Sequence, residues 1–224
     1  MTLRIVLLGA PGSGKGTQGR RLADRHGVPL VSTGEILREA VKHGTALGRQ
    51  VKEQMEQGSL VSDRTMIGLV GERLGEADAA GGFVLDGFPR TLPQAEALDR
   101  MLAGMGLPPI AAVYLRVPAE VVVRRLARRL ECPACRRTYN PAGVPPRREG
   151  VCDTDGAVLV ARKDDDAGSV RRRLEVYLAE TAALLGRYRD AGRLVEVDAD
   201  REPDGVFAAL TAALDGATAG RTGA

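Results

Sequence analysis

The chain has 224 residues, a length that suits one globular domain with modest insertions and is too short for two ordinary domains with separate large cores. Aromatic residues make up only 3% and the formal net charge is +3, so the chain offers little for base stacking and no strong basic field. We therefore expect no nucleic-acid partner. No apolar run approaches the roughly 18 residues of a membrane helix, so we also expect no membrane partner and a cytoplasmic location.

Short apolar runs alternate with amphipathic segments along the chain. The runs predict buried strands at 3–8, 29–32, 83–85, 111–117 and 194–197. The segments predict helices at 15–25, 34–43, 47–57, 63–76, 92–105, 119–130, 166–190 and 204–214. Such alternation is typical of a parallel sheet covered on both faces. The predicted fold is an α/β three-layer sandwich with a five-stranded parallel sheet.

Two stretches break the alternation and predict insertions at the strand ends where ligands bind in such sheets. Residues 33–62 carry two short helical segments with no strand between them. Residues 131–163 are rich in Cys, Pro, Gly and Arg without helical periodicity. The core of a single domain spanning 1–216 then comprises 1–32, 63–130 and 164–216. The small, polar residues 217–224 predict a disordered tail.

A glycine-rich loop follows the first predicted strand. The pattern G-x-x-x-x-G-K from Gly9 to Lys15 lies between a strand and a helix, which is the setting of a phosphate-binding P-loop. A turn without a ligand is the disfavoured alternative. Backbone N–H groups would surround the phosphates, and Lys15, expected on an exposed loop, would reach the β and γ groups. The candidate residues are Gly12, Ser13, Gly14, Lys15, Gly16 and Thr17.

The residue after Lys15 departs from the general motif, because Gly16 stands where Ser or Thr usually holds magnesium. The resulting form, G-x-P-G-x-G-K-G-T, resembles the loop of nucleoside monophosphate kinases. The segments STGEILR at 32–38, GSLVSD at 58–63 and LDGFPRTLPQAEALD at 85–99 then resemble the adenylate kinase family, over about residues 3–214. The resemblance implies reversible phosphoryl transfer from Mg-ATP to AMP, giving two ADP.

The resemblance also implies roles for particular residues. AMP would be bound by Thr33, Arg38, Ser59, Leu60, Val61, Gly87, Phe88, Pro89, Arg90, Gln94, Arg162 and Arg173. ATP would be bound by the loop together with Arg125, Arg129, Thr138, Tyr139 and Arg201. The catalytic group would be Lys15, Arg90, Arg129, Arg162 and Arg173, with Asp86 behind the water shell of Mg²⁺. Because Arg125 and Arg129 lie four apart in the predicted helix 119–130, we expect them on one face.

A phosphate acceptor is already ionised at neutral pH, so the reaction needs no general base. His26 and His43 each precede a glycine at a predicted helix end and are interpreted as capping residues. Thr33 and Gln94 suit the adenine edge, whereas related CMP and UMP kinases carry Ala and Asn there, so AMP is the expected acceptor. GTP in place of ATP as donor stays open. A nucleotide-hydrolysing switch is disfavoured because no N-K-x-D segment occurs.

The three cysteines share one segment with a repeated spacing. Cys132 and Cys135 form C-x2-C, and Cys152 with Asp155 forms C-x2-D, which predicts a closed four-coordinate structural Zn²⁺ site in the 131–163 insertion. Asp as the fourth ligand also resembles some adenylate kinases with a zinc-binding lid. A metal-free lid and a zinc ribbon for nucleic acid are the alternatives. We expect the protein to be a monomer.

Overall fold

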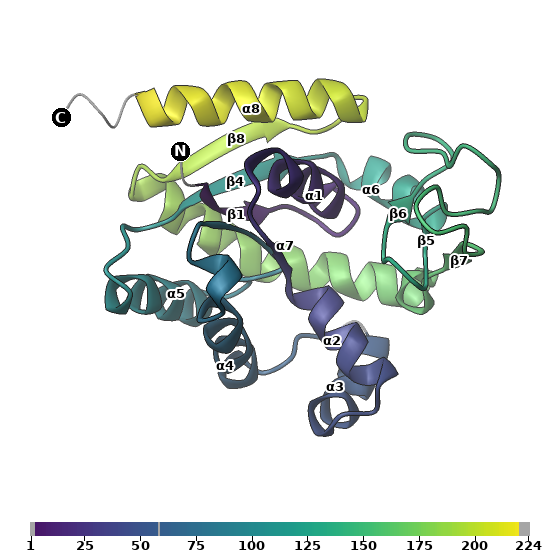
Figure 1. Ribbon diagram of the computed structural model, residues 1–224, viewed down its shortest axis with the longest axis horizontal. Coiled ribbons are helices and arrows are strands. Elements are labelled where there is room, and N and C mark those ends of the chain that lie inside the picture. The colour runs from purple at the N-terminus through teal and green to yellow at the C-terminus, as the bar shows by residue number, and fades with distance from the viewer. Residues whose placement is uncertain (1–2, 58, 220–224) are drawn as a thin grey trace.

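The computed structural model describes residues 3–57 and 59–219, and its centre is a five-stranded, all-parallel sheet (Figure 1). The strands are β1 (Arg4–Leu8), β2 (Leu30–Ser32), β3 (Phe83–Asp86), β4 (Ala111–Arg116) and β8 (Leu194–Asp198), in the order β2-β3-β1-β4-β8. β1 therefore lies between β3 and β4, where the chain changes its direction of travel across the sheet. The predicted fold class and all five predicted sheet strands are confirmed.

Helices cover both faces of this sheet because successive residues of each strand point to opposite sides. Ile5 and Leu7 pack toward α1 (Lys15–His26) and α8 (Pro203–Ala219). Val6 and Leu8 pack toward the other layer. That layer contains α4 (Asp63–Leu74), α5 (Leu92–Gly104) and α7 (Ala167–Asp190), seen below the sheet in Figure 1. The parallel strands are apolar on both sides, as burial on two faces requires.

Three further helices lie at the ends of the strands. α2 (Thr33–Lys42) and α3 (Ala46–Glu56) follow β2 and project below the sheet in Figure 1, and α6 (Ala119–Ala127) follows β4. Two short 3-10 turns, η1 (Ala77–Ala79) and η2 (Lys163–Asp165), complete the helical segments. α8 continues to Ala219, so residues 217–219 are helical and the expected disordered tail is wrong there. The rest of that expectation, 220–224, lies outside the described residues.

The segment after α6 contains a small antiparallel sheet that the sequence did not predict. Its strands are β5 (Leu130–Glu131), β6 (Thr138–Tyr139) and β7 (Val160–Ala161), in the order β6-β5-β7. The lid, defined here as residues 131–163, is built around these strands at the right of Figure 1. Its buried apolar residues are Cys132, Tyr139, Cys152 and Leu159. A core this small leaves the lid dependent on other interactions.

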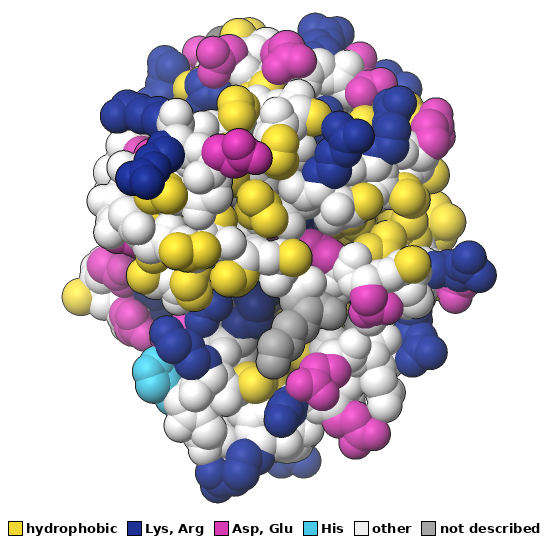
Figure 2. All heavy atoms as spheres, turned by 90° about the vertical axis from the view of Figure 1, so that its right-hand side faces the viewer, with side chains coloured by type: hydrophobic (Ala, Val, Ile, Leu, Met, Phe, Trp, Pro, Cys, Tyr) yellow, Lys and Arg dark blue, Asp and Glu magenta, His cyan; other side chains and the backbone are white. Residues whose placement is uncertain are grey.

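Two features of the structure concern membrane and nucleic-acid partners, namely the apolar character of the helices and the distribution of surface charge. Among the described helices, none combines the length and the apolar character needed to cross a bilayer. On the face that shows the lid side, Lys and Arg side chains are interspersed with Asp and Glu (Figure 2). Such mixing gives no extended field of one sign on this face, in keeping with the low net charge.

Candidate active site

A cavity of about 780 Å³ opens at the carboxyl ends of the sheet strands. Leu8, Ser32 and Asp86, the last residues of β1, β2 and β3, line it, as does Ala199 just after β8. The glycine loop, α6, the lid and α7 supply the other walls. Basic side chains outnumber acidic ones in the lining. This is the place where ligands bind in open parallel sheets, and the charge favours an anionic ligand.

The glycine loop presents unpaired backbone donors to this cavity. Gly12 has φ 81°, and a Cβ there would lie 2.9 Å from Leu126 of α6, so only glycine fits this turn. Gly14, with φ 99°, is the N-cap of α1 and brings no side-chain cap. The first N–H groups of α1 therefore remain available, and no acidic side chain lies in that first turn. An anion at this helix end would meet both the free donors and the positive end of the helix dipole.

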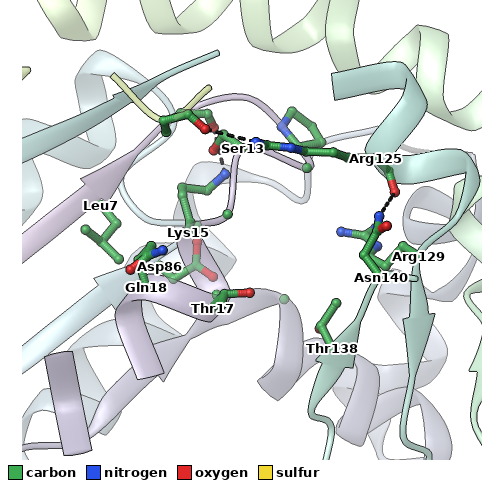
Figure 3. A pocket seen from close by; sticks show the side chains of 18 of the residues that line it. Leu7, Ser13, Lys15, Thr17, Gln18, Asp86, Arg125, Arg129, Thr138 and Asn140 are labelled. Carbon is green, nitrogen blue, oxygen red and sulfur yellow. Dashed lines mark hydrogen bonds between the residues drawn. The ribbon is translucent and has the colours of Figure 1, made fainter. Parts of the chain in front are cut away.

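Lys15 is the first residue of α1 and lies half-buried in the cavity, not exposed as the sequence led us to expect (Figure 3). Its Nζ donates to the carbonyls of Gly9 (2.7 Å) and Ala10 (3.0 Å). Burial, together with repulsion from nearby arginines, lowers the pKa of this ammonium to about 8, against the attraction of the Asp86 carboxylate. A bound phosphate would remove that penalty by placing negative charge beside the ammonium.

Seven of the predicted arginines line the cavity. Four of these form one group around the carboxylates of Glu131, Asp164 and Asp165, and hydrogen bonds to Asp164 and Asp165 hold three of the four. Arg129 Nε donates to Asp165 (2.7 Å), and Arg162 Nε donates to Asp164 (2.9 Å). Arg173 bonds both acids, at 3.2 and 3.1 Å. Burial lowers the pKa of Arg173 to about 10, with Asp164 opposing the shift. The guanidinium groups are therefore positioned in advance and incompletely neutralised.

The fourth arginine of this group approaches a buried acid from the α2 side. Arg38 Nε lies 4.0 Å from the carboxylate of Glu131, a residue only 4% exposed. Arg162 lies 3.6 Å from the same carboxylate. Burial lowers the pKa of Arg38 to about 10, followed in importance by repulsion from Arg162. Arg38 and Arg162 thus share this buried acid with Arg136 of the lid, which lies 3.2 Å from it, where α2 meets the lid.

Glu131, Asp164 and Asp165 were not predicted as site residues. The acidic run after Arg162 was the available signal, but a charge run is usually a solvated surface feature. Only the tertiary pairing shows that these acids face the arginines. A second correction concerns Arg129, since α6 ends at Ala127 and this residue lies beyond it, in the connection to β5. Arg125 and Arg129 nevertheless both line the cavity.

The residues assigned to the acceptor nucleotide divide into two groups. Leu60, Gly87, Pro89 and Arg90 line the cavity together with Arg38, Arg162 and Arg173. Thr33, Ser59, Val61, Phe88 and Gln94 are not among the lining residues. Thr33 is 1% exposed and donates to the Asp86 carbonyl at 3.4 Å, and Gln94 is also 1% exposed. The acceptor side of the cavity is therefore lined mainly by its phosphate-binding candidates.

All the residues assigned to the donor nucleotide line the cavity. Arg125 spans the upper wall in Figure 3, where it donates to the Ala199 carbonyl at 3.0 Å. Asn140 Nδ2 donates to the Arg125 carbonyl at 2.8 Å and ties the lid to α6, a contact that the sequence did not predict. Tyr139 is 2% exposed, with its ring in the lid core, so we attribute its contact with the cavity to its main chain.

Neither histidine lines the cavity among the described residues. His26 is the last residue of α1 and precedes Gly27 in the left-handed conformation. His43 is the C-cap of α2, and its ring Nδ1 lies 3.0 Å from the Glu39 carbonyl. Both histidines lie at helix ends, and the capping interpretation is confirmed for His43, whereas the capping role of His26 stays a prediction.

The predicted metal ligands converge in the lid. One ligand atom from each of Cys132, Cys135, Cys152 and Asp155 lies within 4.8 Å of all the others. The sulfur atoms of Cys135 and Cys152 are 3.5 Å apart, and Asp155 lies 3.3 Å from the Cys132 sulfur. A tetrahedral site with Zn–S bonds of 2.3 Å would separate its sulfur atoms by about 3.8 Å. The four residues can therefore hold one metal ion without rearrangement of the chain.

Two matching turns present these ligands. In the first, the Arg136 N–H donates to the Cys132 carbonyl, and in the second the Gly156 N–H donates to the Cys152 carbonyl, both at 3.0 Å. Both donor residues are left-handed, with φ 62° for Arg136 and 75° for Gly156. Arg136 is the one non-glycine residue with positive φ among the described residues. Its guanidinium contacts Glu39 of α2 at 2.6 Å and Glu131 at 3.2 Å.

Comparison with known proteins gives a consistent result over nearly the whole chain. The family described as adenylate kinase matches residues 7–193. An adenylate kinase of Thermodesulfovibrio yellowstonii is 45% identical over 213 residues, covering 95% of this chain and 99% of the relative. One of Nitrosococcus oceani is 49% identical over 199 residues, covering 88% and 92%. One of Archaeoglobus fulgidus is 44% identical over 213 residues, covering 95% and 98%.

Proposed function

The chain belongs to the adenylate kinase family and acts as a nucleoside monophosphate kinase that converts ATP and AMP reversibly into two ADP, and from that premise we propose a role for each part of its cavity. The observation that carries the proposal is the position of Lys15 and the open N-terminus of α1, which face a group of arginines across one cavity. The triphosphate of ATP and the phosphate of AMP require positive charge on both sides of the moving group.

The glycine loop binds the donor phosphates in this proposal. The free N–H groups of α1 donate to the phosphate oxygens, and Lys15 exchanges its carbonyl partners for the β and γ oxygens. Mg²⁺ bound to ATP would neutralise part of the phosphate charge. Asp86 is the carboxylate that would face its water shell, since it lines the cavity beside Gly16, where a Cβ would lie 3.8 Å from Asp86 Oδ2.

Arginines complete the transfer site. Arg129, Arg162 and Arg173 contact the moving phosphoryl group and neutralise charge that spreads over its oxygens. Arg38 and Arg90 hold the AMP phosphate as the attacking group, and that phosphate needs no general base. The carboxylates of Asp164, Asp165 and Glu131 keep the guanidinium groups in place until the nucleotides bind.

Base selection follows from the remaining assigned residues. On AMP binding, Thr33, Gln94 and the chain at 59–61, of which Leu60 alone lines the cavity, would form the adenine side of the acceptor pocket, with Phe88 and Pro89 shaping its wall. Arg125, Thr138, Tyr139 and the chain near Arg201 form the donor pocket, with ATP as the donor. Initial rates with ATP and with GTP at equal concentration test that choice, and a faster rate with GTP would reassign the donor.

Residues 33–62 and 131–163 act as two covers that exclude water while the core holds the phosphates. The supporting contact is the ion pair between Arg136 of the lid and Glu39 of α2, which joins the two covers directly. A cover that closes over each nucleotide also explains why the cavity walls come from both insertions. Water excluded in this way cannot compete with AMP for the phosphoryl group.

The lid carries a structural Zn²⁺ bound by Cys132, Cys135, Cys152 and Asp155. The donor set of three thiolates and one carboxylate suits zinc, and four protein ligands leave no open position for chemistry. N–H groups also donate to the sulfur atoms of Cys132 and Cys152, at 3.4 Å each, as they do to metal-bound thiolates. The ion supplies stability that the small apolar lid core lacks.

We place the enzyme in the cytoplasm as a monomer that acts on free nucleotides and binds neither nucleic acid nor membranes. Three cysteines kept as thiols in one cluster suit a reducing compartment. Light scattering with and without nucleotide tests the monomer, and a stable dimer would contradict it.

The reaction is tested by measuring ADP formed from ATP and AMP while inorganic phosphate is followed in parallel. The unmodified protein should form two ADP for each ATP consumed, with no release of phosphate. Lys15→Met should lower kcat by about 10²–10³-fold, the cost of removing one transition-state charge contact. Lys52→Met is the matched control, because Lys52 is exposed on α3 and should leave the rate unchanged.

A further inference from the structure

The carboxamide of Gln94 is held at both ends by residues of fixed hydrogen-bonding polarity. Its Nε2 donates to Asp63 Oδ1 at 2.7 Å, and its Oε1 accepts from the Arg90 N–H at 2.8 Å. Asp63 Oδ1 also accepts from Thr91 Oγ1 at 3.0 Å. Asp63 opens α4 and Gln94 lies in the first turn of α5, and these two helices pack side by side (Figure 1).

These contacts determine which way the carboxamide points. An ionised carboxylate only accepts hydrogen bonds and a backbone N–H only donates, so neither partner can adapt to a rotated amide. Rotation by 180° would place Oε1 against the Asp63 carboxylate and Nε2 against the Arg90 N–H. This rotation would break two buried hydrogen bonds. Water cannot replace them, because Gln94 is only 1% exposed.

The locked carboxamide keeps one N–H and one oxygen lone pair for a ligand. Adenine presents a complementary pair on its Watson–Crick edge, the acceptor N1 and the donor amino group at C6. Hypoxanthine has the same ring size but the reverse pattern, a donor at N1 and an acceptor oxygen at C6. A freely rotating carboxamide could match either base, whereas a locked one matches adenine alone.

We infer that Asp63 is a specificity-determining positioning residue, which fixes the Gln94 carboxamide so that the acceptor site selects a 6-aminopurine over a 6-oxopurine. The inference rests on the proposed role of Gln94 at the AMP base. Asp63 acts through Gln94, whose Nε2 donates to its carboxylate. Thr91 supports it by donating to the same carboxylate oxygen.

The test compares AMP with inosine 5′-monophosphate as acceptors at saturating ATP. Asp63→Asn keeps the size of the side chain but adds an NH2 group that can face Oε1 of a rotated Gln94. We expect the ratio of kcat/KM for AMP to that for the inosine nucleotide to fall about tenfold, the usual effect of one buried hydrogen bond. The absolute kcat/KM for the inosine nucleotide should rise, which general damage to the fold would not produce.

Ser62→Ala is the matched control. Ser62 is the N-cap of α4 and accepts from the Thr65 N–H at 3.3 Å, so its loss disturbs the same helix end without touching the carboxamide. The acceptor ratio of this variant should equal that of the unmodified protein. A tenfold fall in the control would assign the effect to the helix end and overturn the inference.

Other outcomes are equally informative. An unchanged ratio in Asp63→Asn, or an equal fall for both acceptors, would overturn the lock while leaving the kinase reaction intact. Absence of ADP formation from AMP in the unmodified protein would instead contradict the proposed function. If Asp63→Asn does not fold, hydrogen exchange of the Gln94 carboxamide in the unmodified protein decides: one of its two protons should exchange more slowly, and equal rates would overturn the inference.

Discussion

Arg136 offers a direct test of backbone strain in the lid. It occupies the left-handed position that Gly156 fills in the matching second turn, with φ 62° against 75°. A residue with a Cβ is less stable in this conformation by about 1–2 kcal/mol, whereas glycine has no such penalty. Arg136→Gly and Arg136→Ala both remove the guanidinium and its contacts with Glu39 and Glu131. The two variants therefore differ mainly in the backbone penalty.

We expect the lid of Arg136→Gly to be more stable than that of Arg136→Ala by about 1 kcal/mol. Gly156→Ala should show a loss of similar size, because nothing lies within 4 Å of an added Cβ and only the backbone conformation opposes it. The ion pair with Glu39 is part-exposed, and its loss is expected to cost about 0.2–1 kcal/mol in both Arg136 variants alike.

Amide hydrogen exchange within residues 131–163 measures this difference, because it reports local opening whether or not the whole protein unfolds. A difference of 1 kcal/mol corresponds to about fivefold faster exchange in Arg136→Ala than in Arg136→Gly. Equal exchange in the two Arg136 variants, together with a clear loss in Gly156→Ala, would refute the reasoning about Arg136.

Three further predictions concern the lid metal and the cavity. Cys135→Ser, or chelation of the unmodified protein, should remove the zinc and lower the thermal midpoint; less than about half an equivalent of zinc in freshly purified protein would contradict the structural site. Bound phosphate stabilises the charged ammonium of Lys15, whose pKa in the free enzyme is about 8. Nucleotide affinity should therefore be constant below that pKa and fall above it, where binding must be accompanied by uptake of a proton. Calorimetry in two buffers of different ionisation enthalpy measures that uptake, and its absence at pH 9 would remove Lys15 from the phosphates. Thr33→Ala should relax discrimination between AMP and CMP more than it lowers kcat, and equal rates with both acceptors in the unmodified protein would refute the assignment.

The sheet and its helices were predictable because burial on both faces imposes a local pattern on the sequence. Apolar runs such as 111–117 and amphipathic segments such as 63–76 carry that pattern within a few residues of their true ends. The lid strands β5, β6 and β7 have two residues each, too few to show any period. They form only because β5 pairs with β6, 7 to 9 residues away, and with β7, 29 to 31 residues away.

The candidate site likewise contains residues that were predictable from the sequence and residues that were not. The glycine loop and the C-x2-C and C-x2-D pairs are local sequence motifs. Their spacing was therefore sufficient to predict Lys15 and the four lid residues that the structure places together. Asp164 and Asp165 became site residues only through arginines from other elements. Asp63 resembles an ordinary first-turn acidic residue of α4 until α5 places Gln94 against it.

The central claim is that phosphoryl transfer occurs directly between two nucleotides in one cavity, with cations and N–H groups but no protein nucleophile. The stereochemical course at the γ-phosphorus tests it most directly, using a thiophosphate analogue of ATP made chiral with oxygen isotopes. One in-line displacement inverts the configuration, so the account predicts inversion in the ADP formed from AMP. Retention would require two successive displacements through a phosphorylated residue of the protein and would contradict the account.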